Sequence, residues 1–151
     1  MQYKRLGVDC DGVLLAYLAG NIDSDGSITI KQHKQNGNFC FVERISLSHI
    51  TKTVPVLLQK TFGGSLRTST SKNRKQLFSW EVSNKKASSA LLLLIPFLRV
   101  KKDQALICLR LRALKGSSGN RARSVELTAT MTNLYAEIKT LNKWEAALCV
   151  S

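Results

Sequence analysis

The sequence predicts an α+β domain in which helices cover one face of a four-stranded antiparallel sheet. The hydrophobic periodicity changes along the chain in the order helix, two strands, helix, two strands and then helices. The strands come as two sequential hairpins, which favours a single antiparallel sheet. The 151 residues are 44% hydrophobic, enough for one compact core, and nothing marks a boundary. We therefore expect residues 1–151 to form one domain.

A first helix is predicted after Asp11, whose side chain can cap its first turn. One side of this helix is apolar at helical spacing, with Leu14, Leu15, Leu18, Ala19 and Ile22. The opposite side carries the small residues Val13, Ala16 and Gly20, and such residues let a second backbone approach closely. We expect one face for the core and one for a second helix.

Two hairpins follow, separated by a short helix. Residues 27–34 and 39–48 alternate with period two around Asn36-Gly37, a pair typical of hairpin turns. Glu43 falls among the apolar positions of the second strand, which predicts a bulge or a strand edge. The short helix ends at Gly63-Gly64, and the second hairpin covers residues 65–83.

Three helices are predicted after the second hairpin. The first covers residues 85–94 and ends before Pro96, and the second covers residues 102–114. The last carries an apolar stripe at gaps of four and three, formed by Leu127, Met131, Leu134, Ile138, Leu141, Trp144 and Leu148. We interpret this stripe as part of the core rather than as a partner site.

The charge of the chain favours a polyanionic partner. Lys and Arg number 23 against 10 Asp and Glu, a formal net charge of +13. The longest apolar run, residues 90–98, is shorter than the ~20 residues that a membrane span needs. Acids near the N-terminus break a signal-peptide pattern, and the four cysteines form no CxxC pair. We expect an intracellular protein that binds nucleic acid without a zinc site, against the alternative of a basic protein with no specific target.

The sheet face turned away from the helices is predicted to be polar and basic. A twisted two-stranded ribbon fits the major groove of DNA, where long polar side chains read base edges. We prefer this interpretation to that of an ordinary solvated face. The predicted DNA-binding residues are Ser27, Thr29, Lys31, His33, Gln35, Arg44, Ser46, Ser48, Arg67 and Ser69, with Lys72, Arg74 and Lys75 at the tip of the second hairpin.

Three segments resemble one known family. LAGNIDSDG, residues 18–26, closely resembles the motif of the LAGLIDADG homing endonucleases and departs from it only at Asn21 and Ser24. IPFLRVKKDQA, residues 95–105, resembles the family's segment around a central lysine, here Lys101. TFGGSLR, residues 61–67, resembles the link into the second hairpin. Together these likenesses cover most of residues 15–109, whereas the C-terminal helices match only in kind.

The resemblance implies the αββαββα fold, with a saddle-shaped sheet over the DNA major groove. It implies an endonuclease that uses Mg²⁺, or another divalent cation such as Mn²⁺, to cut both strands of double-stranded DNA at a long target. Family members with one motif are homodimers, which implies a partly palindromic target and a two-fold axis between the motif helices at Val13, Ala16 and Gly20. Expectations for such proteins include an intron-encoded origin.

The resemblance also implies the roles of individual residues. Asp25 would be the catalytic metal ligand, assisted by the backbone carbonyl of Ser24, and Lys101 would stabilise negative charge. Asp23 is expected to end the helix and order the turn. Asp-Ser-Asp-Gly is also good turn chemistry, which would explain both aspartates if the other two segments were missing.

Several alternatives stay open at this point. Asn21 would either bond across a dimer, face solvent or mark a copy that no longer cuts. The family's polar active-site residue falls near Thr51 and Lys52, without a clear alignment. His33 and His49 are interpreted as surface or DNA-facing residues. A protein on this fold could instead be an RNA maturase or a DNA-binding regulator that does not cut, in an organelle or in a microbial cytoplasm.

Overall fold

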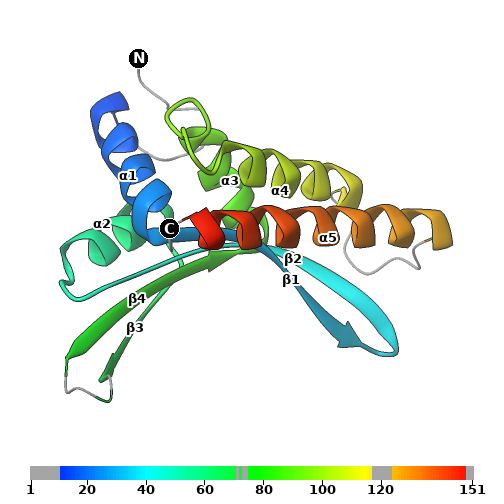
Figure 1. Cartoon of the computed structure of the whole chain (residues 1–151), viewed down its shortest axis with the longest axis horizontal. Helices are drawn as coiled ribbons and strands as arrows, with labels where there is room; N and C mark the ends of the chain where they lie inside the picture. Colours follow the sequence, from blue (N-terminus) through cyan, green and yellow to red (C-terminus); the bar gives the residue numbers. More distant parts are fainter. Residues whose placement is uncertain (1–10, 71, 73–74, 117–123, 149–151) are drawn as a thin grey trace.

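The computed structural model describes residues 11–70, 72, 75–116 and 124–148. Its sheet is antiparallel, with strand order β1-β2-β4-β3 and helices on one face only (Figure 1). The strands are β1 (Gly26–Gln35), β2 (Asn38–His49), β3 (Ser65–Thr70) and β4 (Gln76–Ser83). The helices are α1 (Gly12–Asp25), α2 (Thr53–Phe62), α3 (Asn84–Leu94), α4 (Lys102–Lys115) and α5 (Val125–Leu148). The predicted fold class and element order are confirmed.

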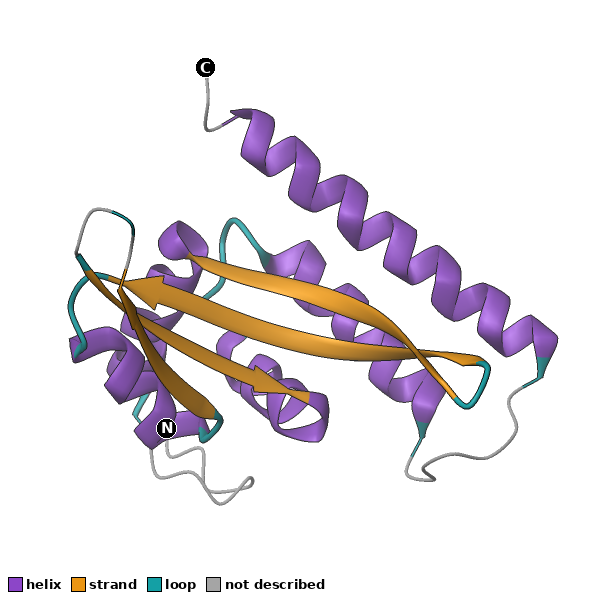
Figure 2. Ribbon diagram, turned by 90° about the horizontal axis from the view of Figure 1, so that it is seen from below, coloured by secondary structure: helices purple, strands orange, loops and turns teal. Residues whose placement is uncertain are grey.

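The sheet is curved into an arch whose concave face points away from the helices. In Figure 1 the β1–β2 hairpin and the β3–β4 hairpin diverge downwards from the centre, below the helical layer. Figure 2 shows the concave face from below, with α5 running beside the sheet on its β1 side. The arch has the shape expected for a saddle that could receive a rod-like partner.

Local chemistry explains where the first elements begin and end. Asp11 caps α1 as predicted, since its Oδ1 accepts the Leu14 backbone N–H at 2.7 Å. The β1–β2 turn needs a positive φ at two successive residues, supplied by Asn36 (51°) and Gly37 (79°). A Cβ at Gly26 would lie 2.8 Å from the Ile22 Cα atom, so only glycine fits where α1 meets β1.

Glu43 departs from the sequence-based expectation. The ladder of β1 and β2 runs through the Ile30–Glu43 pair without a bulge, and Glu43 is fully buried. Ser88 donates to the Glu43 carboxylate at 2.9 Å, Lys115 donates at 2.9 Å, and Arg112 forms an ion pair with it. Burial acts to raise the pKa of Glu43, but the hydrogen bonds from Lys115, the Glu43 backbone and Ser88, together with the charge of Lys115, hold the pKa below its ordinary value. A charge is kept in the core because three groups from α3 and α4 satisfy it.

Candidate functional site

The motif ends where α1 meets the sheet. Asp25 is the last residue of the helix and Gly26 the first of β1, and the side chains of Ser24 and Asp25 are exposed. The Asp25 side chain forms no hydrogen bond or ion pair with another residue in the described part of the chain. The carboxylate is therefore available to a ligand.

Asp23 has a structural role, but not the local one expected. Its two carboxylate oxygens accept the backbone N–H groups of Arg99 (2.8 Å) and Lys101 (3.0 Å). These partners lie 76 and 78 residues further along the chain. Asp23 thus ties the loop before α4 to the end of the motif, rather than ordering only its own turn.

Lys101 lies against the same end of the motif. Its Nζ atom donates to the backbone carbonyl of Asp23 at 2.6 Å, two residues before Asp25. Its side chain is only 8% exposed, and Nζ lies 3.5 Å from Oε1 of Glu145 in α5. The structure brings Lys101 and the motif together, as the resemblance implied. It adds Glu145, which sequence reasoning missed because α5 showed only its apolar stripe.

The motif helix exposes the face that was predicted to meet a second helix. Val13 is 81% exposed and Tyr17 is 52% exposed, while Ala16 and Gly20 are also exposed. A Cβ at Gly20 would meet nothing within 4 Å among the described residues. Asn21 lies on this helix and donates to the Tyr17 carbonyl at 2.8 Å, so its amide is used within its own helix.

The concave sheet face carries most of the predicted DNA-binding residues. The register places Thr29 opposite Arg44, and Ser27 opposite Ser46. The predicted residues on this face are all partly or fully exposed: Ser27, Thr29, Lys31, His33, Gln35, Arg44, Ser46, Ser48, Arg67 and Ser69. Lys72 and Lys75 are exposed near the hairpin tip, and Arg74 lies outside the described residues.

One acid on the concave face was missed. Glu81 of β4 pairs with Ser46 in the ladder and forms an ion pair with Arg44, which fixes the Arg44 guanidinium on the sheet. The period-two alternation of β4 was the available signal, because it placed Glu81 opposite to Trp80 and Val82. Next to it, the hydroxyls of Ser48 and Ser79 form a hydrogen bond of 2.8 Å across the strands.

His49 lies two residues beyond Leu47, the ladder partner of Gly26. Its Nδ1 atom accepts the Thr51 backbone N–H at 3.1 Å and lies 2.9 Å from the Thr51 hydroxyl. A ring nitrogen that accepts an N–H carries no proton, so the proton of the neutral ring sits on Nε2. Thr51, for which the sequence gave no clear alignment, is thus bonded to His49.

The donors at the motif end fit a divalent cation only in part. Within the described residues, no group of three His, Cys, Asp or Glu could hold a metal ion. Asp25 offers a free carboxylate, and the last carbonyls of a helix have no partner inside it. Mg²⁺ takes such hard oxygen ligands, often one or two carboxylates completed by waters and substrate phosphates. Asp25 and the Ser24 carbonyl thus fit a site that other groups must complete.

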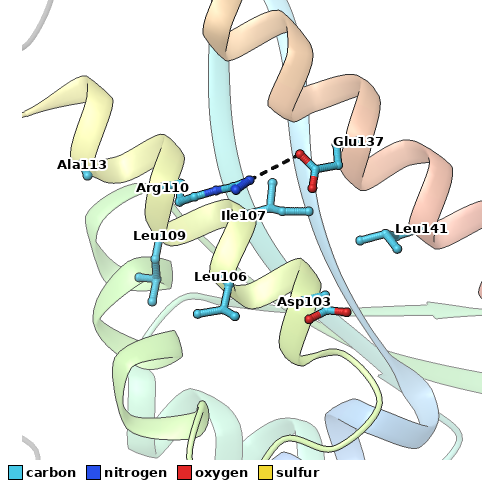
Figure 3. Close-up of a pocket in the computed structure, with 8 residues that line it drawn as sticks. All are labelled: Asp103, Leu106, Ile107, Leu109, Arg110, Ala113, Glu137 and Leu141. Carbon is cyan, nitrogen blue, oxygen red and sulfur yellow. Dashed lines mark hydrogen bonds and ion pairs between the residues drawn. The ribbon is translucent and has the colours of Figure 1, made fainter.

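A groove lies between the last two helices, and no residue of the motif lines it. Figure 3 shows an open groove of about 560 Å³ between α4 and α5, lined by Leu106, Ile107 and Leu141 among others. The Arg110–Glu137 ion pair crosses it at 3.4 Å. No predicted site residue lines this groove.

None of the described helices is long and apolar enough to cross a membrane.

Comparisons with known proteins identify the fold. No protein-family model and no curated protein matches the sequence. Among solved structures, the homing endonuclease I-CvuI in complex with its target is similar, with a TM-score of 0.71 and 18% identity over 85% of this chain and 82% of that one. The archaeal intron-encoded homing endonuclease I-Vdi141I complexed with DNA has a TM-score of 0.69 and 17% identity over 84% and 82%.

A larger protein matches this chain with part of its length. The LAGLIDADG homing endonuclease I-GzeII in complex with its DNA target has a TM-score of 0.63 and 18% identity, over 82% of this chain but only 43% of that one. The same arrangement of helices around a β1-β2-β4-β3 sheet thus recurs in proteins that share few of its residues. The chain has the fold of the LAGLIDADG homing endonucleases.

Proposed function

We propose that this protein is a site-specific DNA endonuclease that uses a divalent metal to hydrolyse both strands of a long, partly palindromic target. The observation that carries the proposal is the free Asp25 carboxylate at the end of the motif helix, with Lys101 held against the same backbone. Asp25 is the last residue of α1 before β1, and Lys101 Nζ bonds to the carbonyl two residues earlier. The sheet that begins there is arched (Figure 1). Two of the solved structures that resemble this chain, I-Vdi141I and I-GzeII, are homing endonucleases in complex with DNA.

The concave face supports binding to double-stranded DNA. Lys31, His33 and Arg67 are exposed there, and the whole chain carries a formal net charge of +13. Phosphate contacts position a protein on the duplex, and contacts to base edges in the major groove specify the sequence. The two hairpins of the arch each supply a ribbon of the kind that enters the major groove.

The exposed face of α1 supports a homodimer. Ala16 and Gly20 would let two copies of α1 approach closely along a two-fold axis. The match to less than half of I-GzeII agrees with a chain that forms one half of such a nuclease. Each chain would then bring its own Asp25 to the axis, so that two carboxylates serve the two scissile bonds.

The chemistry follows from the groups at the motif end. A bound Mg²⁺ or Mn²⁺ supplies Lewis-acid stabilisation of the phosphate and activates water near neutral pH. Asp25 and the Ser24 carbonyl would hold the ion, and the Lys101 ammonium would stabilise the negative charge that develops on the phosphate oxygens. Asp23 keeps the backbone at Arg99 and Lys101 in place.

The test begins with a randomised DNA library incubated with the purified protein and magnesium, followed by sequencing of the cut ends. Discrete cut sites are expected. On the site recovered, Asp25→Asn should abolish cleavage and leave DNA affinity almost unchanged. Asp103→Asn, which changes an exposed aspartate on α4, is the matched control and should cut normally.

Three results would contradict the proposal. Loss of DNA binding by Asp25→Asn to the same degree as cleavage would remove its catalytic role. Specific binding without any cut by the wild-type protein would favour a DNA-binding regulator. Preferential binding of RNA over the same DNA would favour a maturase.

A further inference from the structure

A chain of polar contacts joins the end of α5 to the end of the motif. Glu145 lies 3.5 Å from Lys101 Nζ through Oε1, and its Oε2 accepts from the buried Gln104 amide at 3.3 Å. The same amide lies 3.4 Å from Oδ1 of Asn142. Asn142 in turn donates to the Ile28 carbonyl of β1 at 3.2 Å. The last turns of α5 are thus fixed to β1 and α4 at the point where they approach Lys101.

Burial makes these contacts matter for Lys101. Its side chain is 8% exposed and that of Glu145 is 24% exposed, whereas both partners of the Arg110–Glu137 pair are more than half exposed. An ammonium taken out of water must be compensated by a charge and by hydrogen bonds. Within the described residues, Glu145 is the carboxylate that forms an ion pair with the Lys101 ammonium. Asp23 offers the ammonium only its backbone carbonyl, because its carboxylate bonds to the Lys101 backbone N–H.

We propose that Glu145 is a positioning residue that holds the Lys101 ammonium aimed at the motif end. An ammonium has three N–H donors. The Asp23 carbonyl accepts one of them, and Glu145 Oε1 lies at ion-pair distance without accepting a hydrogen bond, so a donor is left for a phosphate oxygen of bound DNA. Gln104 and Asn142 keep the Glu145 carboxylate in place. This inference rests on the proposed endonuclease function, and it makes α5 part of the active site.

The first test measures cleavage and binding separately on the recovered target site. Glu145→Gln is expected to lower the single-turnover cleavage rate by about 10- to 100-fold, as expected when a reacting group is slightly misplaced. DNA affinity should stay unchanged, and the loss of the counter-charge should lower the unfolding midpoint without unfolding the protein at the assay temperature. Glu145→Asp keeps the charge and should recover part of the rate. Glu137→Gln removes an exposed ion pair from the same helix and should cut like wild type.

A double-mutant comparison separates positioning from a general structural role. If Glu145 acts through Lys101, then Glu145→Gln should cause no further loss of rate in a Lys101→Met background. An equal fold loss in both backgrounds would overturn the proposal. Weakening of DNA binding in parallel with the rate would overturn it as well.

A chemical readout makes the test independent of cleavage. We expect Lys101 to react slowly with an amine-modifying reagent in the wild-type protein and in Glu137→Gln, and several-fold faster in Glu145→Gln, as followed by mass spectrometry. Equal reactivity in all three proteins would show that Glu145 does not hold Lys101. If the wild-type protein cuts no DNA, the endonuclease proposal fails, and this labelling still decides whether Glu145 positions Lys101.

Discussion

Carboxylates of the same chemistry do different work in this protein because their surroundings differ. Asp25 is exposed, and its carboxylate has no partner among the described residues. Both carboxylate oxygens of Asp23 accept backbone N–H groups of a distant loop. Glu43 is fully buried between cations from α4. The pair of aspartates in the motif is therefore divided into a candidate ligand and a structural tie.

Glu43 gives the first prediction, on stability. Glu43→Gln should lower the free energy of unfolding by ~3 kcal/mol, because it removes the buried charge with which Arg112 and Lys115 form ion pairs. The folded pKa of Glu43 lies below its ordinary value of 4.5. Its contribution is therefore complete above that pH and is lost as the pH falls through the lower, folded pKa.

Urea unfolding at several pH values checks this prediction. The difference between wild type and Glu43→Gln should be constant near neutral pH and shrink in acid. Glu137→Gln, in an exposed pair, should stay within about 0.5 kcal/mol of wild type at every pH. A difference for Glu43→Gln that grows on acidification would contradict the assigned ion pairs.

At the residue scale, the sequence predicted the site residues that belong to a motif. It missed the residues that contact them from other helices and strands. Asp25 and Lys101 were identified from segments of recognisable pattern. Glu145 and Glu81 act through contacts to Lys101 and Arg44 that depend on how distant elements pack. Glu43 was interpreted as a bulge or a strand edge, and both were wrong, because β2 is an inner strand with continuous pairing to β1. Its partners Arg112 and Lys115 lie 69 and 72 residues further along the chain.

At the scale of elements, periodicity and turn chemistry were sufficient. The positive φ angles of Asn36 and Gly37 and the cap by Asp11 are local features that a short stretch of sequence specifies. The single antiparallel sheet followed from two hairpins in succession, whereas the pairing of β2 with β4 came from the structure. Local patterns did not predict the polar contacts at the end of α5, where Asn142 donates a hydrogen bond to the backbone of β1.

The concave face of the sheet supplies the prediction for this scale. Lys31→Ala and Arg67→Ala should each weaken binding to the recovered target, with ~1–3 kcal/mol of discrimination lost where the side chain reads a base. A side chain that contacts only phosphate should weaken binding to all sequences alike and reduce its salt dependence. Competition binding against single-base variants of the site at two salt concentrations distinguishes these cases.

The control for the sheet is a lysine on the other layer. Lys60 is exposed on α2, on the helical side of the arch, and Lys60→Ala removes the same charge from the chain. Its effect on affinity should be small. An effect as large as that of Lys31→Ala would mean that net charge, rather than the concave face, accounts for binding.

At the scale of the whole molecule, the proposed site is complete only with two chains. One chain offers a single free carboxylate at the motif end, while cutting two strands needs a site at each scissile bond. The face of α1 that would join the chains is exposed, and Gly20 lies in its middle. Glycine inside a helix lowers stability by ~1 kcal/mol relative to alanine. In a monomer, Gly20 would therefore only destabilise α1.

This contrast between one chain and two yields the last prediction. Gly20→Leu should leave the fold of each chain intact, since a Cβ at this position meets nothing within 4 Å among the described residues. It should shift the protein from dimer to monomer in analytical ultracentrifugation and abolish double-strand cleavage, because the added side chain separates the two copies of α1. Ala129→Leu places the same side chain at an exposed position of α5 and should remain dimeric and active. A dimeric, fully active Gly20→Leu protein would place the two-fold axis elsewhere, and the two Asp25 carboxylates could then no longer be assigned to one shared site.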